Sequence, residues 1–202
     1  MDGVSGFFRN LGKRPVGMRI QKSWIACFLP AALILLITGC GAARKSLTPE
    51  SWAEMEAVVR DRNFTFEARW AEPLPDNSLN QLANAGLIPP GSNANRINLI
   101  NNANFLKMRG DSVEMALPYY GERQVTQTYG RAEGMQFEGV ATDLETRKNE
   151  KRNYQDLDFN LKNKTEVLQC NLRIFNGLRA VLTIFSNQRN MIRYEGTLQV
   201  AE

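Results

Sequence analysis

The chain has 202 residues, of which 25 are basic and 21 are acidic, and it contains no histidine. The lack of histidine excludes Ser-His and Cys-His catalysis, and it excludes metal sites built on imidazole. Five basic residues and one acidic residue lie within residues 1–39, so the rest of the chain has no basic excess that would predict a nucleic-acid partner. The sequence also lacks a glycine-rich phosphate loop and a nucleophile elbow. We therefore predict neither an enzyme nor a bound cofactor.

Residues 1–39 are organised like a secretory signal peptide. Basic residues precede an apolar run from Trp24 to Ile37, which is shorter than the roughly 20 residues of a membrane-spanning helix. The run leads into Ile37-Thr38-Gly39-Cys40, which resembles the bacterial lipobox: an aliphatic residue, two small residues and a thiol. We expect cleavage before Cys40 and attachment of acyl chains such as palmitate at this cysteine.

The residues around Cys40 also predict where the protein resides. Two or more acyl chains hold a protein stably on a membrane, so we expect a lipid-anchored protein. Neither an aspartate nor an acidic cluster follows Cys40, and this favours the outer membrane, with the protein facing the periplasm. The leader begins at Met1, or at Met18 with Arg19 and Lys22 as its basic region.

After the lipidated cysteine and tether of residues 40–47, we predict a single domain over residues 48–202. Thr48 and Pro49 are typical of a helix start, because threonine caps the first turn and proline fits the first helical position. Four apolar residues at helical spacing extend this helix to about residue 62. These residues are Trp52, Met55, Val58 and Val59.

From Phe64 onward, apolar and polar residues alternate, as in strands with one buried and one exposed face. We expect eight or nine strands in sequential order without crossover helices. This favours an antiparallel up-and-down, lipocalin-like barrel, with a two-sheet sandwich as the alternative. Gly110-Asp111 and Asn176-Gly177 predict tight hairpin turns, the latter of type I′. The expected strands include residues 64–70, 97–100, 105–109, 113–117, 135–137, 157–161, 168–174, 178–184 and 192–200.

Residues 73–104 interrupt this alternation with many asparagines and four prolines. We predict an insertion containing a short helix over Ser78–Ala85, with Gly86 just past its end. The insertion is either a lid over a barrel mouth or a surface loop.

Five short elements stand out between about Phe64 and Val200. They are Asn104-Phe105-Leu106 with Gly110-Asp111, Leu117–Gly121, Gly134–Gly139, Ile174–Gly177 and Ile192–Gly196. Together they resemble a family of Gram-negative, Bacteroides-type lipoprotein domains classed as a domain of unknown function, although Tyr120 departs from the phenylalanine usual at its position in the family. The resemblance implies a lipocalin-like β-barrel behind a lipoprotein leader, and it implies no activity.

Tyr119, Tyr120 and Tyr194 are the candidate ligand-binding residues, because tyrosine offers apolar area and one hydroxyl at a ligand mouth. The alternative is a structural corner in which the hydroxyl ties down a neighbouring loop. Asp156 and Asp158 are paired carboxylates, but they fall on the polar side of an alternating strand and indicate a solvated surface. A basic run from Arg147 to Arg152 indicates a solvated loop, and Cys170 indicates a buried structural thiol.

Two functions remain open at this point. One is a lipid-anchored barrel that holds a small apolar or amphipathic ligand. The other is a structural or protein-interaction module of the cell envelope with a filled core. An eight-stranded barrel has room for either a packed interior or one small ligand.

Overall fold

The structure is a computed structural model that describes residues 47–201 apart from residues 75, 122–133 and 164. All of these lie in one compact unit, Lys45–Glu202. The predicted leader and Cys40 lie outside the described residues. Among the described residues, no helix has the length and apolar character needed to cross a membrane.

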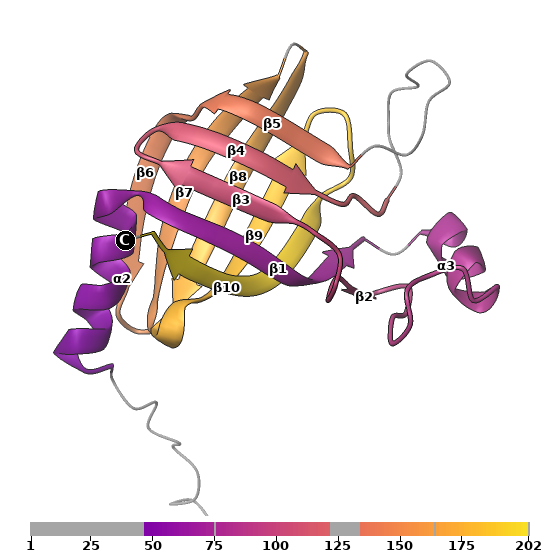
Figure 1. Cartoon of the computed structure of the whole chain (residues 1–202), viewed down its shortest axis with the longest axis horizontal. Helices are drawn as coiled ribbons and strands as arrows, with labels where there is room; N and C mark the ends of the chain where they lie inside the picture. Colours follow the sequence, from indigo (N-terminus) through magenta and orange to yellow (C-terminus); the bar gives the residue numbers. More distant parts are fainter. Residues whose placement is uncertain (1–46, 75, 122–133, 164, 202) are drawn as a thin grey trace, which may run out of the picture. The chain divides into compact units, whose positions relative to one another are not determined.

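Both predicted helices are present. Helix α2 spans Pro49–Asp61, and its first turn is capped by the Thr48 hydroxyl, which accepts a hydrogen bond from the Ser51 amide at 3.3 Å. Helix α3 spans Asn77–Asn84, capped by the Asp76 carboxylate, which accepts from the Leu79 amide at 2.6 Å. Figure 1 shows the two helices near opposite ends of strand β1.

The strands form one antiparallel sheet in sequential order, which confirms the predicted mainly β, up-and-down arrangement. The order is β5-β4-β3-β1-β10-β9-β8-β7-β6, and the short β2 pairs with β1. The bounds are β1 Asn63–Pro73, β2 Ile97–Asn98, β3 Phe105–Arg109, β4 Ser112–Leu117, β5 Met135–Val140, β6 Thr142–Asn149, β7 Tyr154–Asn163, β8 Glu166–Phe175, β9 Arg179–Ser186 and β10 Ile192–Val200.

This order nearly closes a barrel (Figure 1). Strand β1 pairs with β10 from Phe64↔Val200 to Pro73↔Ile192, so the first and last strands of the chain are neighbours. The two ends of the order, β5 and β6, are consecutive in the chain, with Ala141 between them, and do not pair with each other. The gap between β5 and β6 is the seam of the barrel. All eight side chains of β6 are exposed or half-exposed there, and seven of them are polar. Such side chains discourage edge-to-edge pairing.

The barrel interior is filled. Inward-facing side chains of the long strands expose at most a few per cent of their surface, and most expose 0–1%, so they pack against one another and not against solvent. Cys170 is among them, as predicted, and burial raises the pKa of its thiol far above its usual range. The most enclosed of these residues are Phe64, Phe66, Leu106, Met108, Leu157, Leu161, Leu172, Ile174, Leu182, Ile184, Ile192 and Tyr194.

Two local predictions were wrong. Arg147 and Lys148 lie in strand β6 and not in a loop; their strand was missed because nearly all its side chains are polar and exposed at the barrel's seam. The Asn176-Gly177 turn is a three-residue 3-10 turn over Asn176–Leu178, not a two-residue type I′ turn. There Gly177 and Leu178 both have positive φ, at 71° and 54°.

A β-bulge in β1 changes which way its last residues face. The pairing with β10 shifts between Ala68 and Trp70, so Arg69 has no partner and Trp70 lies opposite Glu195 on the outer face. The alternating pattern had placed Trp70 on the same face as the buried Phe66, and the extra residue reverses this. Gly196 stands opposite the bulge, where an added Cβ would lie 1.9 Å from the Glu67 carbonyl oxygen.

Candidate functional site

The three candidate tyrosines lie together at the end of the barrel near α3. Tyr194 is fully buried, and its hydroxyl donates a hydrogen bond to the Pro118 carbonyl oxygen at 2.7 Å. Burial, followed by the neighbouring Tyr119 and Tyr120, raises the pKa of Tyr194 well above its ordinary value. The phenol is therefore a neutral donor that ties β10 to the end of β4, as expected of a structural corner.

Tyr119 makes a second tie of the same kind. Its hydroxyl donates to the Asn190 carbonyl oxygen at 3.1 Å, across 71 residues of sequence. The Arg189 guanidinium carbon lies 5.2 Å from the centre of the Tyr119 ring. Arg189 also pairs with Glu166 at 2.8 Å, and these two side chains expose only 10% and 16% of their surface. The loop between β9 and β10 is thus held by an ion pair, a ring contact and a hydrogen bond.

An open groove of about 500 Å³ separates this corner from α3. Tyr119 and Tyr120 are half-buried and line it, whereas Tyr194 lies beneath and does not reach it. Burial raises the pKa of Tyr120, which is also hydrogen-bonded to Asn102. We call this space the mouth groove; its other lining residues are Asp76, Ser78, Leu79, Leu82, Pro118, Gly121 and Gly134.

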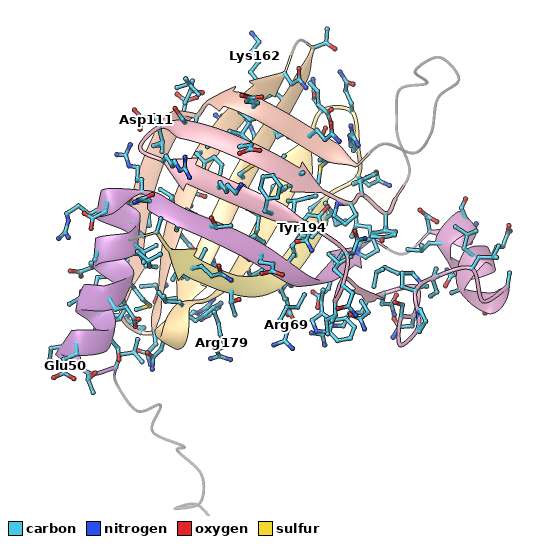
Figure 2. All side chains as sticks on the ribbon, viewed as in Figure 1. Glu50, Arg69, Asp111, Lys162, Arg179 and Tyr194 are labelled. Carbon is cyan, nitrogen blue, oxygen red and sulfur yellow. The ribbon has the colours of Figure 1, made fainter. Side chains whose placement is uncertain are left out.

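A second groove, which the sequence did not predict, lies on the outer wall of β1, β9 and β10 and has a volume of about 550 Å³. We call it the outer-wall groove. Trp70 reaches it because of the bulge, and Arg69 faces outward at the bulge itself. Four arginines line it with a single carboxylate, and Figure 2 shows Arg69 and Arg179 projecting from the same side of the barrel. The lining residues are Arg69, Trp70, Arg96, Phe175, Arg179, Ala180, Val181, Arg193, Glu195, Gly196 and Thr197.

The four arginines differ in how they are held. Arg96 donates to Glu195 at 2.5 Å, and its guanidinium carbon lies 4.5 Å from the centre of the Trp70 ring. Arg96 and Arg193 both lie 3.7 Å from carboxylate oxygens of Glu72. Arg69 and Arg179 are exposed and form no ion pair with any residue that the structure describes.

The paired carboxylates lie beside this groove and are already occupied. Asp156 is 5% exposed and accepts two hydrogen bonds from Arg173, at 2.8 and 3.0 Å. Asp158 accepts from Arg147 and from Asn171. Asp156 points outward, as the prediction of a solvated surface requires. Its side chain is nevertheless buried, because Arg173 covers it. Within the described residues, no group of three potential metal ligands occurs.

Signals for the outer-wall groove were present in the sequence but dispersed. Arg69, Arg179 and Arg193 occupy outward positions on three separate strands, and only the sheet register brings them together. Gly196 within a strand is a recognised sign of a bulge or a close backbone approach, and here it marks both.

Comparison with known proteins agrees with the fold and adds no activity. A search of curated proteins found no match. A solved structure, the crystal structure of a DUF4251 family protein from Bacteroides eggerthii DSM 20697, is similar with a TM-score of 0.50 and 17% identity. The similarity covers 75% of this chain and 88% of that one, and at this identity it concerns the fold alone. The family model described as "Domain of unknown function (DUF4251)" matches residues 47–198, so the chain belongs to the DUF4251 family.

Proposed function

We propose that this protein is a lipid-anchored protein of the bacterial envelope whose barrel is a filled scaffold and whose outer surface does the binding. The observation that carries the proposal is the packed interior. Side chains such as Phe66, Leu172 and Tyr194 are completely enclosed, so a ligand inside the barrel would need many of them to move at once. Both grooves described above open outward instead.

Native mass spectrometry of the full chain purified from cells tests the filled interior. We expect the mass of the protein with its acyl chains and no tightly enclosed small molecule. A stoichiometric small molecule that survives dialysis and leaves only on unfolding would contradict the proposal, because only an interior site would retain it in this way.

The anchor is part of the proposal and has its own test. We propose that Cys40 carries the lipid and places the domain at the outer membrane, facing the periplasm. Labelled palmitate should enter the wild-type protein and not the Cys40→Ala variant, with Cys27→Ala as the matched control that keeps its label. Equal labelling of wild type and Cys40→Ala would remove the anchor and with it the proposed location.

A small amphipathic ligand at the mouth groove is the second candidate function. It is favoured by one observation: Tyr119, Tyr120, Leu79 and Leu82 line the same groove. Such a ligand should exchange freely on dialysis, unlike one in the interior. Its binding should weaken in Tyr120→Ala and persist in Tyr154→Ala, a tyrosine on another part of the barrel.

A further inference from the structure

We propose that the outer-wall groove binds a small organic anion, a carboxylate- or phosphate-bearing molecule with an apolar body. The inference rests on the proposed function, since it names a ligand class for the surface of a barrel whose interior is filled. The groove's volume of about 550 Å³ lies within the range of roughly 300–1,000 Å³ common for small-molecule sites.

The charge of the groove is local and positive. Four arginines line it, and two carboxylates offset them: Glu195 in the lining and Glu72 beside it. The chain beyond residue 39, by contrast, carries equal numbers of basic and acidic residues. The four arginines are Arg69, Arg96, Arg179 and Arg193. Arginine presents a planar set of donors that matches carboxylate and phosphate groups. The groove therefore selects for anions in a domain that has no general basic excess.

Two of these arginines are available and two are fixed. Glu195 and Glu72 hold Arg96 and Arg193 in place. Arg69 and Arg179 make no ion pair in the described part of the chain, and their side chains extend to the same side of the barrel (Figure 2). An incoming anion would thus meet two guanidinium groups without a described ion pair beside a pre-arranged pair. Arg96 and Arg193 would need little ordering on binding, whereas Arg69 and Arg179 would lose side-chain freedom.

The apolar part of the ligand is expected from the other lining residues. Trp70, Phe175 and Val181 are each half-buried along the groove, on β1, β8 and β9. Arg96 lies over the Trp70 ring and restricts its movement. A bare inorganic anion would leave this apolar surface uncovered, whereas an aromatic or aliphatic body would bury it.

The bulge in β1 explains why the groove exists at this place. A bulge breaks the ladder locally, and bulges commonly re-aim a side chain beside a binding site. Here it turns Trp70 outward next to Glu195 and leaves Arg69 unpaired in the ladder. The Arg69 carbonyl oxygen accepts a hydrogen bond from the Leu99 amide at 2.9 Å, which holds the segment that carries Arg96 against the bulge.

Trp70 supplies a local probe for the test. The chain has three tryptophans, and Trp24 lies in the leader that the proposed cleavage removes. Trp24→Phe with Trp52→Phe therefore leaves Trp70 as the sole tryptophan, whether or not the leader is cleaved, in the protein purified in detergent. This protein would be titrated with phenyl phosphate and benzoate, with inorganic phosphate lacking the apolar body and benzyl alcohol lacking the charge. We expect saturable changes in Trp70 fluorescence with phenyl phosphate or benzoate, and at least tenfold weaker binding of the two partial probes.

Arginine variants test whether the probes bind in the outer-wall groove. Arg69→Ala and Arg179→Ala should each weaken binding about tenfold, the effect of losing one charge-assisted hydrogen bond. Arg109→Ala is the matched control, because Arg109 is exposed on β3 and forms no described ion pair, and it should leave the affinity unchanged. Equal affinity in all variants, no saturable response at millimolar probe, or equal binding of inorganic phosphate would overturn the inference. None of these results would alter the mass-spectrometric test of the filled interior.

Discussion

The mouth and the outer-wall groove use their polar side chains in opposite ways. At the mouth, the hydroxyls of Tyr119 and Tyr194 and the ion pair of Arg189 with Glu166 bind other parts of the fold. On the outer wall, Arg69 and Arg179 bind nothing that the structure describes. The distinctive tyrosine motif, Leu117–Gly121, therefore has a structural role. Arg69 and Arg179, which no sequence motif marks, are the side chains that we propose for a ligand.

The largest effect should come from Arg189→Ala at the mouth. The change leaves Glu166 largely buried without its cation, and breaking a buried ion pair in this way costs about 3–5 kcal/mol. We expect the free energy of unfolding, measured by urea denaturation, to fall by that amount. Arg109→Ala, an exposed arginine without a described partner, serves as the control. A loss below 1 kcal/mol for Arg189→Ala would mean that the mouth is not held by this pair.

Gly196→Ala should cause the second-largest loss in the free energy of unfolding, and it acts through the backbone of the outer wall. An added Cβ would lie 1.9 Å from the Glu67 carbonyl oxygen and 2.8 Å from the Ala68 Cα, so β1 and β10 must separate. Overpacking of this kind costs roughly 1–3 kcal/mol. The control is Gly139→Ala, whose Cβ would meet only the movable ring of Phe137 at 3.0 Å.

If the bulge builds the groove, Gly196→Ala should also shift the fluorescence of Trp70 in the protein with Trp70 as its only tryptophan. A stable variant with unchanged Trp70 emission would contradict the link between this glycine and the groove.

A smaller loss is expected for Tyr194→Phe. The substitution keeps the ring packed and removes the hydroxyl that donates to the Pro118 carbonyl oxygen, which leaves a partly buried acceptor without this partner. The cost should be about 1–2 kcal/mol in urea denaturation. Tyr119→Phe should cost less, because the Tyr119 side chain is half-buried, whereas that of Tyr194 is fully buried. The reverse order would make Tyr119 the main tie of this corner.

The sequence predicts the barrel well, because a filled barrel imposes alternation on every strand that packs inward. Strands β8 and β9 show this directly, and the predicted helix cap at Thr48 depends on a few neighbouring residues. Strand β6 was not predicted, because at the seam of the barrel it buries almost no side chain and its sequence therefore does not alternate.

The candidate site could be predicted only in part. The tyrosine corner lies close to one short motif, Leu117–Gly121, and Tyr194 joins it through the β10 register. The outer-wall groove depends on a one-residue slip at Arg69 that reverses the facing of Trp70. A prediction that simply extends the alternation along a strand cannot detect such a slip. The opposing Gly196 is the one local sign of it in the sequence.

The smallest effects on stability should be those of Arg69→Ala and Arg179→Ala, and they test the comparison most closely. Both side chains are exposed and without a described ion pair, so each change should alter the free energy of unfolding by no more than about 0.5 kcal/mol. Arg96→Ala, which loses its pair with Glu195 and its contact with Trp70, should cost more than either. Full stability combined with weakened binding of phenyl phosphate would separate ligand recognition from folding on this wall. A destabilisation as large as that of Arg189→Ala would instead give these arginines the same structural role as the residues of the mouth.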